Sequence, residues 1–470
     1  MDWIIASVIV MFGIALALAR SPWLVDYSVF IFVFNRGLRR IVDFYFYHAF
    51  NPFSPISLTP LLIAGAMALC CIFDFYRLQQ WGRRIFACLA GATLYAFLVG
   101  FVSFKLAAVY AFGEALPPLA LAGYALSLNP NNSVCDRWIR SFSWAAILAS
   151  VYGWFQYLTI PPWDGFWLRE VGFIGYMGIP EPTKMTVFST MAERGPLASY
   201  LGFSVVPMIV SPKWRTVLGW PAVVLVFSVI LLTASRGGLV MAVSATTIFV
   251  LVNRGAKKGQ VTLALLIVGS AAWFGISRMP NSETVKSRFS TLKNIRDDGS
   301  YKGRVQIMTN GIGQLALRPL GNGLGSGGLG IRINEGAVQS VSMVGDAGYF
   351  QILLVYGIIG TGLMARGLYL SWRRLTIYNQ IKEFRSDHVL LARALMIATL
   401  VCCWLGDLVT QFSVFWIALG CGLAMRKESL LRLKARMLSA VESRPEIELT
   451  AVALHPDPST PSCTLEKGFK

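Results

Sequence analysis

The chain has 470 residues, of which 55% are hydrophobic and only 14% are charged, and its formal net charge is +18. A soluble protein carries about 25% charged residues, so the composition excludes an ordinary soluble enzyme or binding domain. Many of the cations stand in short clusters between apolar runs, which is the positive-inside pattern of membrane proteins. We therefore predict a membrane protein that interacts with membrane lipids, and no nucleic-acid partner.

Repeated apolar runs of about 17–25 residues are typical of transmembrane helices. Lipid offers no hydrogen-bond partners to an open sheet, so such a chain must be helical. The predicted fold is an all-α polytopic membrane protein with about twelve transmembrane helices, within a range of about 11–13. The expected spans cover residues 1–19, 22–35, 55–75, 85–104, 106–128, 140–160, 196–211, 216–234, 237–253, 260–277, 346–371, 389–406 and 410–425.

The basic clusters set the expected orientation. Clusters near residues 213–215, 254–258, 373–374 and 426–427 alternate with two longer loops, 161–195 and 278–345. The positive-inside rule places the clusters in the cytoplasm and both loops outside. Counting both early runs as spans puts the cluster 36–40 outside, against the rule, so the topology of the first 55 residues stays open.

Three regions follow from this organisation. Residues 1–139 form N-terminal transmembrane helices, residues 140–425 form a core with both external loops, and residues 426–470 form a cytoplasmic tail. The tail is polar and contains proline, which predicts disorder. Within the larger loop, residues 305–317 have the pattern of a short amphipathic helix.

Cysteine and histidine usage argues against two kinds of site. None of the eight cysteines falls in the two external loops, so no disulfide framework is expected. There are three histidines and no zinc-type spacing, so we expect no metal site and no cofactor.

The first loop offers aromatic and basic candidates for substrate binding. Trp163 and Trp167 can stack on the apolar faces of sugar rings, or they belong to the aromatic belt at the water interface. Lys184 and Arg194 flank the step Ser189-Thr190 and can hold an anion, or they are ordinary surface charges.

Arg236 lies between two long apolar runs, in the sequence Thr233-Ala-Ser-Arg-Gly-Gly238. Such an arginine is costly unless it faces water, a partner or an anionic substrate. The glycines allow a ligand to approach closely, and the following helix start adds backbone donors for an anion. The alternative is a helix-end arginine that extends to the membrane surface.

The second loop is strongly basic although it is predicted to be external. Its cations are Arg278, Lys286, Arg288, Lys293, Arg296, Lys302, Arg304, Arg318 and Arg332. An anionic lipid phosphate or diphosphate explains them most simply, because arginine binds such oxygens in a bidentate manner. The glycine-rich run after Pro319 lacks the Lys-Ser/Thr ending of a nucleotide P-loop. Asp346, where the chain re-enters the membrane, is a helix N-cap or a general base.

Several of these segments together resemble the bacterial O-antigen ligase and O-antigen polymerase superfamily. The segments are Ser189-Thr190 near Arg194, Ser235-Arg-Gly-Gly238, Arg304, Pro319-Leu-Gly-Asn-Gly-Leu-Gly325 and Tyr349-Phe-Gln-Ile-Leu353 with Tyr356-Gly-Ile-Ile-Gly360. The resemblance covers roughly residues 140–425. It implies glycan transfer from an undecaprenyl-diphosphate carrier at the periplasmic face of the bacterial inner membrane, without nucleotide sugar or essential metal.

By this resemblance, Arg236 and Arg304 hold the donor diphosphate and stabilise it as the leaving group. Ligases of the superfamily carry a histidine just before the helix that starts here, whereas this sequence has Gly345-Asp346-Ala347. The proposed base is therefore a carboxylate, Asp346 first and Glu335 second. The candidates for substrate binding are Lys184, Arg194, Arg288, Arg318, Glu335, Trp163 and Trp167.

The missing histidine favours a polysaccharide polymerase, making O-antigen or exopolysaccharide, over a ligase. Its expected partners are an undecaprenyl-diphosphate-linked oligosaccharide and the chain-length regulator and flippase of the same pathway. An O-antigen ligase and a protein O-oligosaccharyltransferase are the nearest alternatives. A multi-pass solute transporter is the alternative of another class, because Lys105, Glu114 and Asp407 are potential intramembrane charges. A non-catalytic component of a secretion complex is a further alternative.

Overall fold

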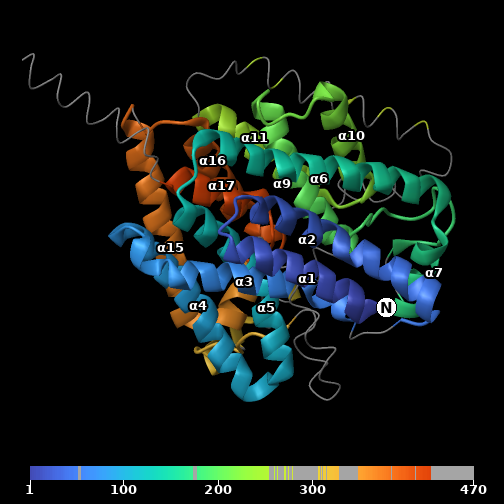
Figure 1. Ribbon diagram of the computed structural model, residues 1–470, viewed down its shortest axis with the longest axis horizontal. Helices are drawn as coiled ribbons and strands as arrows, with labels where there is room; N and C mark the ends of the chain where they lie inside the picture. Colours follow the sequence, from blue (N-terminus) through green and yellow to red (C-terminus); the bar gives the residue numbers. More distant parts are fainter. Residues whose placement is uncertain are drawn as a thin grey trace, which may run out of the picture. The chain divides into compact units, whose positions relative to one another are not determined.

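A computed structural model gives the arrangement of the chain (Figure 1). It describes residues 1–50, 54–172, 177–252, 315–327, 348–382, 384–407 and 409–424, with scattered positions between 259 and 313. The chain divides into two units, Met1–Arg426 and Lys427–Lys470, and the second lies outside the described residues.

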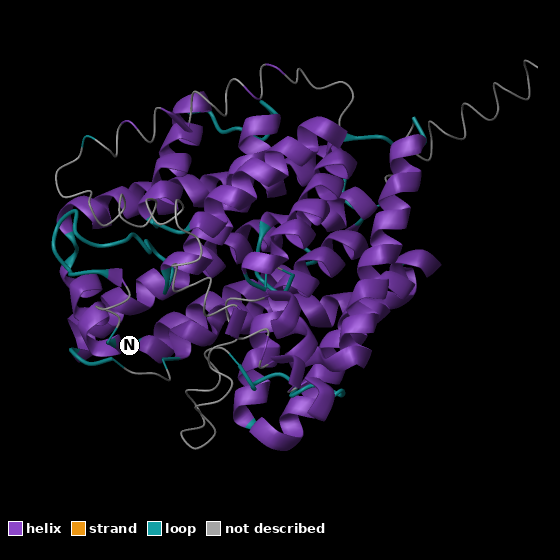
Figure 2. Cartoon of the chain, turned by 180° about the vertical axis from the view of Figure 1, so that it is seen from behind, coloured by secondary structure: helices purple, strands orange, loops and turns teal. Residues whose placement is uncertain are grey.

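The described residues form helices and loops, and no strand is present among them (Figure 2). Residues 178 and 185 form a single isolated antiparallel bridge. The helices are α1 (Asp2–Leu18), α2 (Trp23–Val42), α3 (Thr59–Phe73), α4 (Gln80–Phe104), α5 (Leu106–Leu128), α6 (Asn132–Thr159), α7 (Pro162–Val171), α9 (Arg194–Val210), α10 (Gly219–Leu232), α11 (Arg236–Val252), α15 (Gly348–Gln380), α16 (Asp387–Cys402) and α17 (Val414–Leu423).

Four segments are long and apolar enough to cross a membrane. They are Pro55–Phe73, Gln80–Phe104, Leu106–Leu128 and Gly348–Gln380. Four shorter apolar helices accompany them in the described part of the chain, namely α1, α10, α11 and α17. The all-α fold class and the presence of helices able to cross a membrane agree with the expectation from sequence, whereas the number of about twelve spans stays a prediction. The expected run 260–277 and most of loop 278–345 lie outside the described residues.

Several helices depart from the expected boundaries. α2 continues to Val42 rather than residue 35, α6 begins at Asn132 rather than residue 140, and α15 continues to Gln380, well beyond residue 371. α4 begins at Gln80 rather than residue 85, and α17 starts only at Val414. Side-chain caps fix two of the helix starts, because Asn131 accepts from the backbone of Val134 and Ser386 accepts from Val389. Such caps satisfy amide groups that have no partner inside the helix.

One end of the helix bundle carries the first predicted loop, and we call it the loop end. α7 and residues 177–193 lie there, together with the last turns of α2 and α6, as the contact between Arg40 on α2 and Asp164 on α7 demonstrates. Figure 1 shows α2 and α6 running to α7, close to which the N-terminus also lies. The basic cluster 36–40, whose side was open from sequence, is therefore on the same side of the bundle as loop 161–195.

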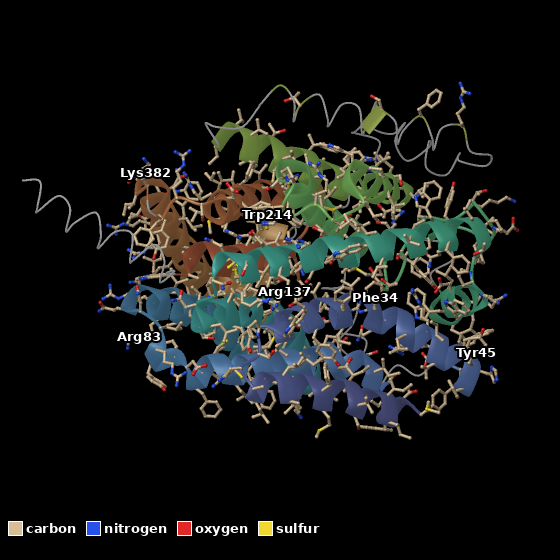
Figure 3. The ribbon with its side chains drawn as sticks, turned by 45° about the horizontal axis from the view of Figure 1, so that its top comes forward. Phe34, Tyr45, Arg83, Arg137, Trp214 and Lys382 are labelled. Atoms are coloured by element: carbon tan, nitrogen blue, oxygen red, sulfur yellow. The ribbon has the colours of Figure 1, made fainter. Side chains whose placement is uncertain are left out.

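The opposite ends of the same helices are joined by a second group of contacts. The Trp138 indole donates to the carbonyl of Pro22, over 2.7 Å, and Arg137 pairs with Asp26 at 3.0 Å. Lys213 reaches Asp387 at 2.9 Å. Figure 3 shows the labelled cations Arg83 and Lys382 far from Tyr45, which follows α2 at the loop end.

The glycine-rich run 319–327 packs against α15 at a point where that helix is broken, and its backbone hydrogen-bonds to the broken helix. Gly357 has φ 62° and ψ −174° inside that helix, so its neighbours lose their regular hydrogen bonds. The Ile358 amide donates to Pro319, while the Asn322 amide donates to the carbonyl of Leu354. Backbone groups of α15 that lose their helical partners at the break thus bond to the glycine-rich run instead. This satisfies them in the low-polarity surroundings of a membrane helix.

Glycine is required where this run crosses α4. Gly323 has φ 81°, and a Cβ there would lie 2.0 Å from the backbone nitrogen of Gly100. The Leu324 amide donates to the carbonyl of Ala96 at 2.8 Å. The run is therefore packed closely against α4, and its glycines allow backbone to meet backbone.

The link between α16 and α17 folds into the bundle. Asp407 is 8% exposed and Phe412 is 7% exposed. The Phe412 ring stacks on Phe32 of α2 at 3.9 Å and on Phe142 of α6 at 5.6 Å. Asp407, which the sequence indicated as a potential intramembrane charge, is therefore buried, because Phe412 packs between two central helices.

Candidate functional site

Four of the sequence-predicted site residues lie outside the described part of the chain. They are Asp346, Arg304, Arg288 and Glu335. The others are described, and they fall into two groups. Arg194, Arg236, Trp163 and Trp167 stand at helices of the loop end or beside them, whereas Lys184 and Arg318 are exposed on loops.

The loop end is held together by a buried ion pair. Arg40 Nε lies 3.0 Å from Asp164 Oδ1, and the two side chains are 2% and 0% exposed. The guanidinium also donates to the carbonyl of Met191 at 2.9 Å and to that of Ser189. Because a buried charge is costly unless it is paired and hydrogen-bonded, these partners fix the position of α2 against α7 and residues 189–191.

The other oxygen of Asp164 is tied to α6. It accepts from Gln156 at 2.6 Å and from Tyr152 at 2.9 Å. Burial raises the pKa of Asp164, and Arg40, Gln156 and Tyr152 oppose that rise. Gln156 in turn accepts from the amide of Ser189 at 2.8 Å. The network therefore orients the step Ser189-Thr190, which the sequence had singled out, through backbone contacts.

The two tryptophans of the first loop contribute to this packing. Trp167 is 7% exposed, contacts the ring of Phe188 at 5.5 Å, and lies beneath the Arg40 guanidinium at 5.6 Å. The Trp163 indole donates to the Tyr152 hydroxyl at 2.6 Å and is half-buried. Trp167 nevertheless lines a cavity, so part of its side chain can contact a bound group.

That cavity has a volume of about 100 Å³ and is lined by three arginines of α2. Its wall consists of Arg36, Arg39, Arg40, Phe50, Ser57, Tyr110, Trp167, Val171, Ala192 and Glu193. The volume equals that of about three water molecules, so it fits a small group such as a phosphoryl. We call it the arginine cavity.

Two of the three arginines keep partners that an incoming anion can replace. Arg36 lies 3.5 Å from Glu114, and both side chains are about one-third exposed, at 34% and 33%. Arg39 lies 3.3 Å from Asp43 and donates to Ser57 at 2.9 Å. Burial raises the pKa of Asp43 to about 6, with the nearby Asp2 adding to the rise and Arg39 opposing it. Below that pH Asp43 is neutral, and the charge of Arg39 is less compensated.

Arg194 and Arg236 begin two neighbouring helices. Arg194 is the first residue of α9 and Arg236 the first of α11. A Cβ added to Gly238 would lie 2.6 Å from the carbonyl oxygen of Ala198, so the first turns of the two helices are in backbone contact. Helix starts favour negative charge, and here each one carries a guanidinium as well. Both side chains are half-buried.

Lys184 and Arg318 have simpler surroundings. Lys184 pairs with Glu181 at 2.6 Å, and both side chains are exposed. Arg318 is exposed and donates to Asn322 at 3.2 Å, at the start of the glycine-rich run. The described contacts of both residues are to neighbours in the chain. Neither residue is among those that line the arginine cavity.

The arginine cavity was missed by the sequence interpretation. The sequence nevertheless contained an indication of it. If both early runs are spans, the positive-inside rule is violated by Arg36, Arg39 and Arg40, and such a violation suggests a functional role. Glu193, which precedes Arg194, lines the same cavity and makes the cavity continuous with the start of α9. α2, α9 and α11 thus each bring arginines to the loop end.

Among the described residues no group of three or more His, Cys, Asp or Glu side chains can hold a metal ion. No protein-family model and no curated protein sequence matches this chain.

Proposed function

We propose that the protein is a membrane glycosyltransferase that polymerises polysaccharide repeat units carried on undecaprenyl diphosphate. The observation that carries this proposal is the group of arginines at the loop end, where those of α2 line one cavity and Arg194 and Arg236 begin two adjacent helices. A diphosphate is the anion that such an assembly suits best, because guanidinium groups bind its oxygens in pairs. The apolar helices beneath support a donor that is itself a membrane lipid.

The proposed reaction needs two functions from the protein. A hydroxyl of the acceptor repeat unit attacks the anomeric carbon of the donor, and its proton passes to a carboxylate, for which Asp346 remains the first candidate. The bond from that carbon to the diphosphate breaks, and the diphosphate leaves with the electron pair. Arg236, Arg194 and Arg304 stabilise its charge as it develops, which is the role of preorganised donors in catalysis.

In the cell, the proposed reaction would take place at the periplasmic face of the bacterial inner membrane. The loop end would face the periplasm, and the ends near Lys213 would face the cytoplasm. The arginines 36, 39 and 40 would then stand outside because they belong to the site, which gives their violation of the positive-inside rule a physical reason. The repeat-unit flippase and the chain-length regulator are the partners that this reaction calls for.

A deletion strain complemented with variants tests the proposal. The deletion should reduce surface glycan to single repeat units, and Arg236→Ala should do nearly the same, with a loss of rate of about 10²–10³-fold. Arg236→Lys should recover only part of the polymer, because an ammonium cannot bind two oxygens in a bidentate manner. Chain length is read on a gel of extracted glycan.

Arg77→Ala is the matched control, since Arg77 is 62% exposed and pairs with Asp74 away from the loop end. Long polymer in the Arg236→Ala strain would argue against the proposal. Long polymer that stays on its lipid carrier in the deletion strain would indicate a ligase. A surface glycan that is unchanged in the deletion strain would leave the glycosyltransferase proposal without support.

A solute carrier is the second candidate, and one observation favours it. α15 is broken at Gly357, and the link between α16 and α17 buries Asp407, whose carboxylate accepts from Thr410. Broken helices and intramembrane carboxyls occur in secondary transporters. Proton-coupled uptake in vesicles that Asp407→Asn abolishes and Arg236→Ala leaves intact would favour the carrier.

A further inference from the structure

The wall of the arginine cavity carries more positive than negative groups. Among the described residues that line it, Arg36, Arg39 and Arg40 are cationic and Glu193 is the one carboxylate, an excess of two positive groups. The three arginines stand three and four positions apart on α2, so they share one face of that helix. A ligand with two negative charges would balance this wall.

The carboxylates that pair with Arg36 and Arg39 are not part of the wall. Glu114 lies 3.5 Å from Arg36 and Asp43 lies 3.3 Å from Arg39, and neither is among the described residues that line the cavity. A guanidinium has five N–H donors, so Arg39 can bind a ligand and keep Asp43 as its partner. The pair of Arg36 and Glu114 is long and one-third exposed, and such a pair is replaced at a cost of about 0–1 kcal/mol.

The size and charge of the cavity select among small anions. Its volume of about 100 Å³ admits a phosphoryl or a carboxyl group. A carboxylate or a phosphate diester has one charge, no more than the Glu114 carboxylate that it would replace. A phosphate monoester carries about 1.5–2 negative charges at pH 7 and has three acceptor oxygens. It therefore matches the wall and can accept from Arg36, Arg39 and the Ser57 hydroxyl together.

Aromatic residues beside the cavity indicate the level at which it lies in the membrane. Tyr45 and Tyr47 follow α2 directly and are 56% and 46% exposed, and the Tyr45 ring lies 6.1 Å from that of Trp163. Exposed tyrosine and tryptophan side chains are typical of the membrane–water interface, where the headgroups of lipids lie. This favours a phosphate that is carried by a lipid over one that comes from solution.

We infer that the arginine cavity binds the terminal phosphate of a membrane lipid through Arg36 and Arg39. Arg40 maintains the shape of the cavity, because its described bonds go to Asp164 and to two backbone carbonyls. The place of this site in the reaction rests on the proposed function. The donor diphosphate is esterified at both ends, whereas the carrier released by glycan transfer has a free terminal phosphate. The released carrier is thus the ligand of this class that the reaction supplies.

Binding of short-chain lipids to the full chain in an uncharged detergent tests the inference by titration calorimetry. The probes are dihexanoyl phosphatidate, which has a terminal phosphate, dihexanoyl phosphatidylglycerol, which is a diester, and inorganic phosphate. Phosphatidate should bind roughly tenfold more tightly than phosphatidylglycerol, because of its second charge. It should also bind more tightly than inorganic phosphate. Equal binding of inorganic phosphate would overturn the lipid as the source of the ligand.

Three variants change the cavity in different ways. Arg36→Gln removes a charged donor and should weaken phosphatidate binding roughly tenfold. Ala192→Leu fills part of the cavity without changing its charge, since Ala192 lines it, and should weaken binding at least as much. Asp43→Asn removes the negative charge beside Arg39 and should tighten binding at pH 7. A variant that merely misfolds would not bind more tightly.

Arg77→Gln is the matched control and should bind phosphatidate as wild type does, since Arg77 is 62% exposed and pairs with Asp74. Equal affinities for phosphatidate and phosphatidylglycerol would overturn the inference. So would wild-type affinity in both Arg36→Gln and Ala192→Leu. Loss of binding in Arg236→Gln but not in Arg36→Gln would place the ligand at the start of α11 and would also overturn it.

The chain length of the surface glycan separates this inference from the proposed function. If wild type makes polymer and yet does not bind phosphatidate, the inference fails and the function stands. If deletion of the protein leaves the glycan unchanged and phosphatidate binding still depends on Arg36 and Ala192, the phosphate site stands and the proposed function fails.

Discussion

An aspartate lies among cations and hydrogen-bond donors at each end of α6, Asp136 on α6 itself and Asp164 on the neighbouring α7, and their surroundings differ. At the loop end Asp164 is 0% exposed and is paired with Arg40. At the other end Asp136 is 19% exposed and shares His388, Trp214 and Lys213 as partners. The first arrangement is a single buried pair that admits one geometry, whereas the second is a half-exposed cluster in which water can replace a partner.

The pKa values of the two aspartates reflect this difference. Burial raises the pKa of Asp164 even though Arg40 opposes it. Burial also acts to raise the pKa of Asp136, but the hydrogen bond and charge of His388, with Trp214 and Lys213, lower it to about 2. Burial thus dominates at the loop end, where the proposed site is built, and pairing dominates at the opposite end. The buried pair at the loop end should therefore tolerate substitution less well than the half-exposed cluster.

The largest effect is expected from Asp164→Asn. It leaves the Arg40 guanidinium buried without a counter-charge, which typically costs about 3–5 kcal/mol. Unfolding of the detergent-solubilised protein should occur at a clearly lower temperature, and the double variant Arg40→Met/Asp164→Leu should recover much of the loss. An unchanged unfolding temperature for Asp164→Asn would contradict the buried pair.

Asp43 should make the loop end sensitive to pH. Its pKa rises from 3.8 to about 6 on folding, so the folded state holds this proton more tightly than the unfolded state. The free energy of unfolding should therefore fall as pH rises from about 4 through about 6, by about 3 kcal/mol. Thermal unfolding measured across this range should show the decline in wild type and a flatter profile in Asp43→Asn. A profile that is equally steep in both proteins would assign the dependence to another group.

His388→Gln tests the cluster at the opposite end. It removes the contact to Asp136, which measures 2.8 Å, and should cost about 1–3 kcal/mol, as for a hydrogen bond to a charged group. The folded pKa of Asp136 is depressed, so its stabilising effect is present above about pH 4 and is lost as pH falls toward about 2. The decrease in the free energy of unfolding as the pH falls should be smaller in His388→Gln than in wild type. Identical acid profiles would exclude His388 as the main partner.

Lys184→Ala should have the smallest effect. Its pair with Glu181 is exposed, with side-chain exposures of 45% and 52%, and such pairs contribute about 0–1 kcal/mol. The unfolding temperature should stay within error of wild type at moderate salt. A decrease in unfolding temperature as large as that of Asp164→Asn would mean that this part of the loop is packed more tightly than the exposure of Lys184 indicates.

Much of the secondary structure could be predicted because the membrane restricts the choices. Each apolar run had to become a helix, and the expected boundaries lie close to those of α5, α9 and α11. Arg194 and Arg236 could be placed at helix starts for the same reason. Asp346, Arg304, Arg288 and Glu335 remain predictions, because they lie outside the described residues.

The break in α15 could not be predicted from its apolar pattern. Gly357 is one of several glycines in that run, and only the docking of Pro319 and Asn322 on its freed backbone groups makes the break stable. The burial of Asp407 has a similar origin, since it depends on Phe412 finding Phe32 and Phe142. Neither partner is near in sequence.

The sequence by itself determined the all-α class, the positions of most helices and the presence of arginines at their ends, because lipid enforces local hydrogen bonding. The tertiary structure alone decided which partners those arginines have. Arg40 reaches the carbonyl of Met191, 151 positions away, and no local pattern encodes such a pairing. The pairing forms because the buried guanidinium of Arg40 needs hydrogen-bond acceptors, and the packing of the helices places the Met191 carbonyl beside it.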